Sequence, residues 1–207
     1  MTRTRLSTFC DGMVEACLLL AVVGVPLFFS PYSVRIFEPD KVYLLRYLSL
    51  LIVLFWTVSH MESGFDDLFQ SGQSGRSVFL SIVRTPLVLP VLFLVLSFLL
   101  SAILSVSPRV SFFGSYDRLQ GVVTVLSYVV AFFAVLDTIR TREQIDRIIQ
   151  GLVMTSVPIS VYAILQHFDI DVLPWMEAST ERTGSAMGNP IFLGAYLAMV
   201  VPVTIYR

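Results

Sequence analysis

The stretch LVLPVLFLVLSFLLSAILSV, residues 87–106, contains no charged side chain. A membrane's hydrocarbon core, about 30 Å thick, is crossed by roughly 20 apolar residues in a helix. The whole chain has the same character: 56% of its 207 residues are hydrophobic, 14% are charged and the mean hydropathy is +0.79. These values lie outside the range of ordinary soluble domains. The sequence therefore predicts a membrane protein.

Further apolar runs lie on both sides of this stretch. Backbone polar groups must be satisfied within lipid, and the alternating pattern of a barrel is absent from the sequence, so these runs are expected to be helices. The predicted fold is an all-α, polytopic transmembrane bundle that forms a single domain over residues 1–207. Its spans are expected at about 13–30, 40–60, 87–106, 122–139, 149–167 and 190–206.

The distribution of basic residues predicts the orientation. With the N-terminus inside, eight Lys or Arg residues fall on the inner side and five on the outer side, so we expect a cytoplasmic N-terminus. The first run is interpreted as a retained helix, since no convincing signal-peptide cleavage site follows it. Residues 140–147 (RTREQIDR) are expected to form a charged turn. A net charge of −1 with scattered basic residues argues against nucleic-acid binding.

A polar island, SPRVSFFGSYDRLQG at 107–121, follows the opening stretch and carries Arg109 and Arg118. The next outer loop carries Arg182 and closes with Gly188, Asn189 and Pro190, where Asn189 suits an N-cap. In this topology the second, fourth and sixth helices all begin on the outer face, and helix N-termini favour anions. Arginine adds forked donors for phosphate oxygens. The alternative is that these residues only anchor helices at the interface.

Two further cations lie in the second predicted span. Lys41 follows the helix start at Pro39 and Asp40, and Arg46 lies roughly 9 Å into the helix. An arginine at that depth must snorkel to the surface or face a polar cavity. The two histidines, His60 and His167, stand at helix ends and are interpreted as packing or capping residues. No catalytic residue is assigned, and no metal or cofactor site is expected, the two cysteines included.

Several segments resemble bacterial proteins of the O-antigen ligase and polymerase family. SPRVSFFGSYDRLQGVVTVLSY, with Gly114, Tyr116, Arg118, Gln120 and Gly121, is similar to their Gly-x-Tyr-x-Arg-x-x-Gly pattern. ERTGSAMGNPIFLGAYLAMVVP resembles a later Arg...Gly-Asn-Pro-x-Phe-x-Gly-x-Tyr segment. YAILQHFDIDVLPW and FEPDKVYLLR resemble the segment preceding it and the entry to the second helix. The resemblance covers most of the chain from about residue 36 and corresponds to the N-terminal part of a typical member.

The resemblance implies a glycosyltransferase of the bacterial inner membrane. Such an enzyme moves glycan from an undecaprenyl-diphosphate donor to a glycan or lipid acceptor hydroxyl. It makes Arg118 and Arg182 the first candidates for binding the diphosphate, and Arg109, Lys41 and Arg46 weaker ones. Family members carry further helices and a large outer loop, so the 207-residue chain is expected to be inactive alone. The alternative is a non-enzymatic membrane subunit, working with a partner chain, or a lipid-diphosphate binding module.

Overall fold

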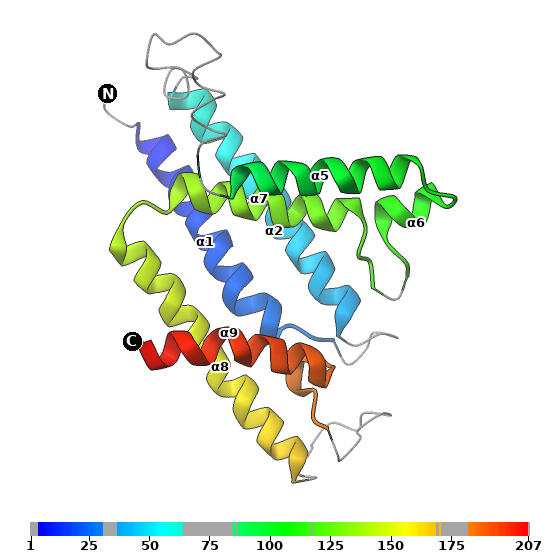
Figure 1. Ribbon diagram of the computed structural model, residues 1–207. Helices are drawn as coiled ribbons and strands as arrows, with labels where there is room; N and C mark the ends of the chain where they lie inside the picture. Colours follow the sequence, from blue (N-terminus) through cyan, green and yellow to red (C-terminus); the bar gives the residue numbers. More distant parts are fainter. Residues whose placement is uncertain are drawn as a thin grey trace. The chain divides into compact units, whose positions relative to one another are not determined.

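The computed structural model describes residues 4–30, 37–63, 85, 87–116, 118–168, 170 and 182–206. Within these ranges all regular structure is helical and no strand occurs, which confirms the all-α prediction for this part of the chain. The elements are α1 (Arg5–Leu27), α2 (Glu38–Ser63), α5 (Val88–Ile103), α6 (Pro108–Phe113), α7 (Val122–Thr138), α8 (Arg142–His167), the 3-10 helix η1 (Ser185–Met187) and α9 (Pro190–Tyr206) (Figure 1).

Three helices, α1, α2 and α8, are long and apolar enough to cross a membrane. At 1.5 Å per residue, their 23 to 26 residues extend about 35 to 39 Å. The apolar helices α5, α7 and α9 have 16 or 17 residues and extend about 24 to 26 Å. The chain is thus a membrane protein by the composition of its helices, with three of the six predicted spans at full length.

Two helices begin before the predicted spans, among polar residues. α1 begins at Arg5 rather than near residue 13. α8 begins at Arg142, so residues 142–147 are helical and the predicted charged turn is wrong. The cause is a capping box. The Thr141 hydroxyl accepts from the Gln144 amide at 3.3 Å, and the Gln144 side chain accepts from the Thr141 amide at 3.0 Å.

The chain divides into two compact units. Unit 1 comprises residues 1–18 and 46–138, and unit 2 comprises residues 19–45 and 139–207. Helices α1 and α2 therefore contribute to both units. The single-domain assignment over residues 1–207 stays a prediction.

In unit 1, side-chain hydrogen bonds connect α2 with α7. Arg46 contacts Thr124 and Ser49 contacts Ser127, both with a sequence offset of 78 residues, and Trp56 contacts Asp137 at an offset of 81. A near-constant offset means that the two helices run in the same direction. In Figure 1, α5 lies along α7, and α6 follows it at the start of the 107–121 segment.

Unit 2 packs α8 against α9 and η1 (Figure 1). Its buried core consists of Ile159, Leu193, Tyr196 and Val200. Helix α9 starts where the sequence predicts, because the Asn189 side-chain oxygen accepts from the Ile191 amide at 2.8 Å and Pro190 is its first residue.

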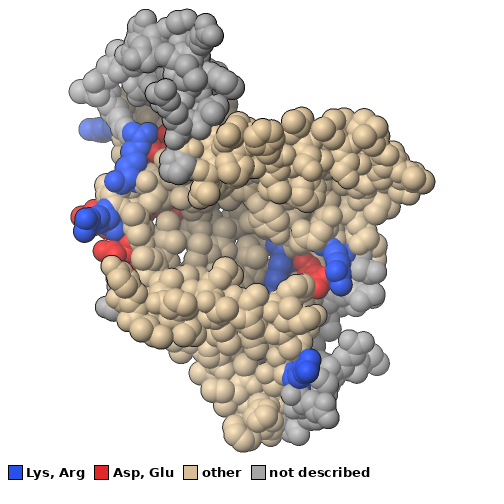
Figure 2. Space-filling model, in the orientation of Figure 1, with Lys and Arg blue, Asp and Glu red and all other residues tan. Residues whose placement is uncertain are grey.

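The outer surface of the helices is apolar. On the face shown in Figure 2, no Lys, Arg, Asp or Glu lies over α5 or α9. Several large side chains of α5 are well exposed, among them Phe93 at 63% and Leu96 at 52%. Such a surface is expected to face lipid, since soluble proteins rarely expose apolar patches of this kind.

Candidate functional site

The segment from Gly114 to Gly121 forms a closed loop in unit 1. Gly114 has φ 90°, and a Cβ there would collide with the Leu119 backbone. A Cβ on Gly121 would lie 2.5 Å from both the Gly114 nitrogen and the Phe112 oxygen. The two ends of the loop therefore touch backbone to backbone. This close approach requires glycine at both positions.

Arg46 holds the base of this loop. Its Nη2 donates to the carbonyl oxygens of Leu119 at 2.7 Å and Phe113 at 2.9 Å. Nε and Nη2 both donate to the Thr124 hydroxyl, at 3.1 and 2.8 Å. That hydroxyl in turn donates to the Leu119 carbonyl at 2.7 Å. The guanidinium thus bridges α2, the loop and the start of α7. We name Arg46, Thr124 and the two carbonyls the loop clamp.

The clamp holds a backbone conformation that bulky residues seldom adopt. Leu119 has φ 53°, in the left-handed region, and is buried. Such a residue costs about 1 to 3 kcal/mol and persists only where its surroundings enforce it. Three donors to its carbonyl, from Arg46, Thr124 and the Gly121 amide, and the burial of its side chain supply that enforcement.

The tip of the loop is exposed. Tyr116 is 77% exposed, and Arg118 lies two residues further on with its side chain exposed. Asp117 lies outside the described residues. Arg109, on α6, is exposed as well. The loop therefore exposes Arg118 and Tyr116 on a backbone that the loop clamp holds in place.

A second ordered loop in unit 2 surrounds η1. The Lys41 ammonium donates to the carbonyls of Ala186 at 2.6 Å and Pro26 at 3.0 Å, and lies 3.8 Å from the Met187 sulfur. Ser185 is buried with φ 48°, and its amide donates to Gln166 Oε1 at 2.7 Å. Its hydroxyl donates to the Ile159 carbonyl at 2.6 Å.

The remaining predicted residues of unit 2 flank η1. Arg182 lies three residues before it and is exposed. Gly188 follows with φ 74°, and a Cβ there would collide with the Phe37 ring. Asn189 then caps α9 through its side chain, so its oxygen serves the helix itself.

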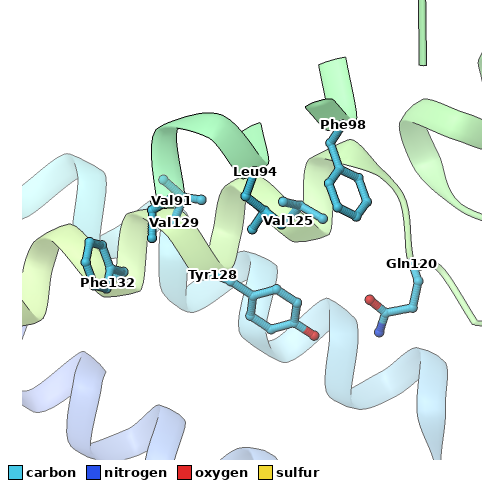
Figure 3. Close-up of a pocket in the computed structure, with 8 residues that line it drawn as sticks. All are labelled: Val91, Leu94, Phe98, Gln120, Val125, Tyr128, Val129 and Phe132. Atoms are coloured by element: carbon cyan, nitrogen blue, oxygen red, sulfur yellow. The ribbon is translucent and has the colours of Figure 1, made fainter. Parts of the chain in front are cut away.

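An open apolar pocket lies between α5 and α7 in unit 1, with a volume of about 430 Å³. Its walls are aliphatic and aromatic, and Gln120 and Tyr128 supply its polar side-chain atoms. Figure 3 shows the Gln120 amide and the Tyr128 hydroxyl at the end of the pocket where the chain leaves the loop. The lining residues are Val91, Leu94, Phe98, Gln120, Val125, Tyr128, Val129 and Phe132.

The predicted cations fall into two structural classes. Arg46 and Lys41 donate to backbone carbonyls inside their own units. The snorkelling and cavity interpretations of Arg46 stay predictions. Arg109, Arg118 and Arg182 are exposed. Arg46, Arg109 and Arg118 belong to unit 1, while Lys41, Arg182, Gly188 and Asn189 belong to unit 2. Their joint role in anion binding stays a prediction.

The sequence did not reveal the hydrogen-bond partners of Arg46 and Lys41. Thr124 is an ordinary helix residue in the sequence, and the carbonyls of Leu119 and Ala186 carry no side-chain signal. The positive φ of Leu119 and Ser185 is equally invisible, since neither is glycine or asparagine. The available signal was the pair of glycines at 114 and 121, which marks a tight loop.

No family model matches the chain, and no match was found among curated proteins or solved structures.

Proposed function

We propose that the chain is the N-terminal membrane part of an O-antigen ligase-like glycosyltransferase of the bacterial inner membrane. It would have six spans and a cytoplasmic N-terminus, and bind an undecaprenyl-diphosphate-linked glycan at the outer face. The observation that carries the proposal is the loop at 114–121. Its two motif glycines are the residues that close it, and its motif tyrosine and arginine are exposed at the tip.

The chemistry of the donor fits this arrangement. When the glycosidic bond to the diphosphate breaks, negative charge grows on the departing phosphate oxygens. Preorganised cationic donors stabilise that charge more than they stabilise the bound ground state. A guanidinium offers two parallel N–H groups to a phosphate, and the clamp beneath Arg118 limits the entropy lost when the loop binds.

The α5–α7 pocket supports a lipid-linked donor. Its lining is apolar along α5 and α7, which suits an isoprenoid chain, and its polar groups lie next to the loop that carries Arg118. An apolar tail and an anionic head would then be bound by adjoining parts of one unit. Arg182, an exposed residue of unit 2, is a separate candidate for phosphate binding, and Arg182→Ala in the binding assay below tests it by itself.

Binding by the purified chain tests the proposal directly. The 207-residue protein is placed in lipid nanodiscs and titrated with undecaprenyl diphosphate, with dioleoyl phosphatidylcholine as host lipid. A hydrogen bond to a charged group contributes about 1.5 to 3 kcal/mol, and the exposure of Arg118 places its loss at the low end. We expect Arg118→Ala to weaken binding about tenfold and Arg118→Lys to weaken it less, because lysine keeps the charge and loses the fork.

The matched control is Arg5→Ala, which removes another exposed arginine of unit 1 on the predicted cytoplasmic side. It should leave the affinity unchanged. Binding by Arg118→Ala that equals the unsubstituted chain would remove Arg118 from the site. The alternative, a lipid-diphosphate binding module, predicts the same binding; Arg118-dependent glycan transfer by a longer protein that contains this sequence would favour the glycosyltransferase.

A further inference from the structure

Three side chains of unit 1 meet at the C-terminal end of α2. Trp56 Nε1 donates to Asp137 Oδ2 at 2.7 Å. His60 Nε2 lies 3.5 Å from the same oxygen, and His60 Nδ1 lies 2.9 Å from the Trp56 carbonyl oxygen. The imidazole also meets the indole edge to face, with ring centroids 5.2 Å apart.

The partners of the imidazole decide its protonation. A backbone carbonyl only accepts hydrogen bonds, so Nδ1 must carry a proton. Asp137 Oδ2 accepts from the indole N–H of Trp56. A carboxylate oxygen has a second lone pair, so the same atom is an acceptor toward His60 Nε2. Both ring nitrogens therefore face acceptors. A neutral ring would point a lone pair at one of them, whereas an imidazolium donates to both.

The surroundings of His60 are polar. His60 lies in the last turn of α2. Next to it, Ser59 donates to Asp11 of α1 at 2.7 Å. The other charged residues of these two helices are Glu38, Asp40, Lys41, Arg46 and Glu62 on α2 and Arg5 and Glu15 on α1.

From this geometry we propose that Trp56, His60 and Asp137 form a proton-binding site that fastens α7 to α2. The bound proton gives His60 its second N–H, which completes the bridge from the α2 carbonyl to the Asp137 carboxylate. Loss of that proton removes the Nε2–H donor from the bridge, while Trp56 Nε1 still donates to Asp137. The side chains of His60 and Asp137 are 20% and 31% exposed, so the proton can exchange with solvent. This proposal is independent of glycan transfer.

Indole fluorescence of the full chain in detergent micelles tests the proposal. The chain has two tryptophans, and Trp175→Phe leaves Trp56 as the only one. An imidazolium in contact with an indole quenches it more strongly than a neutral imidazole does. We expect emission to rise in one single-proton step as the pH is raised through the range of histidine titration, about 5 to 8.

Variants in the Trp175→Phe background assign the step. His60→Gln should abolish it. Asp137→Asn keeps an acceptor for the indole and removes the carboxylate that faces Nε2, so the midpoint of the step should change. His167→Gln, which removes the other histidine, is the matched control and should change nothing. A step that survives His60→Gln, or a midpoint unmoved by Asp137→Asn, would overturn the proposal.

Nitrogen NMR provides a second measurement that leaves the site intact. In His167→Gln the only imidazole is His60, and its two ring nitrogens report protonation separately. We expect both to be protonated at pH 5 and only Nδ1 at pH 8.5. A ring that keeps one proton across this range, or that loses its proton from Nδ1, refutes the proposal even if His60→Gln does not fold.

Discussion

Replacing Arg46 by leucine removes the loop clamp and should release the 114–121 loop while the helices stay folded. The guanidinium donates to three acceptors, the carbonyls of Phe113 and Leu119 and the hydroxyl of Thr124. The last two remain bonded to each other at 2.7 Å, which limits the loss to one or two contacts. With about 1.5 to 3 kcal/mol for each charge-assisted contact, we expect a local loss of about 2 to 4 kcal/mol.

Hydrogen–deuterium exchange measures this loss where it occurs. In the loop, the Leu119 amide donates to the Ser115 carbonyl at 2.8 Å and the Thr124 amide to the Gly121 carbonyl at 3.0 Å. Since 1.4 kcal/mol corresponds to a factor of ten, exchange of a peptide covering residues 113–124 should accelerate roughly 30-fold to 1000-fold. Arg46→Lys should give a smaller acceleration, because an ammonium keeps the charge but cannot span the same acceptors.

The control is Tyr47→Leu, the neighbouring position on α2, whose side chain is 64% exposed. It should leave exchange in the loop as it was. A peptide from the middle of α7 serves as an internal reference, because faster exchange there would mean global unfolding. Unchanged protection of residues 113–124 in Arg46→Leu, with α7 intact, would refute the clamp.

Two further substitutions test the packing of the loops. Gly121→Ala should destabilise unit 1 by about 1 to 3 kcal/mol, because its Cβ would meet backbone atoms at 2.5 Å. Gly12→Ala, with open space around its Cβ inside α1, should instead stabilise the protein by about 0.5 to 1 kcal/mol. Chemical denaturation in micelles measures both free energies of unfolding, and equal effects would contradict the packing argument. Lys41→Met should accelerate hydrogen–deuterium exchange of the amides around η1 about tenfold or more, because it removes the donor to the Ala186 carbonyl. Tyr43→Phe, on the exposed side of α2, should leave this exchange unchanged. Equal exchange rates in the two variants would show that Lys41 does not hold η1.

Local chemistry made part of the fold predictable from the sequence. Apolar runs locate the helices because the requirement for about 20 apolar residues is a property of composition. The start of α9 is also local, since Asn189 and Pro190 act within one turn. The start of α8 was equally readable, because Thr141 and Gln144 have the spacing of a capping box. It was missed because the charges of residues 142–147 were interpreted as a loop.

The contacts that build the loops could not be read in this way. Arg46 meets acceptors 67 to 78 residues away, and Lys41 meets a carbonyl 145 residues away. Their acceptors are mostly backbone groups, which are the same at every position of a sequence. A single sequence therefore shows that these cations need partners but does not indicate which ones.

Lys41 and Arg46 need hydrogen-bond acceptors, and the carbonyl groups of the two loops need donors, so the same contacts satisfy both. A cation in an apolar helix costs about 2.5 to 3.5 kcal/mol at the bilayer centre, and irregular backbone at membrane depth must be satisfied by protein. Lys41 and Arg46 meet both requirements at once, because each donates to carbonyls that lie outside regular α-helical pairing or at a helix end. Lys41 and Arg46 therefore stabilise the two ordered loops through the same contacts that satisfy their own charges.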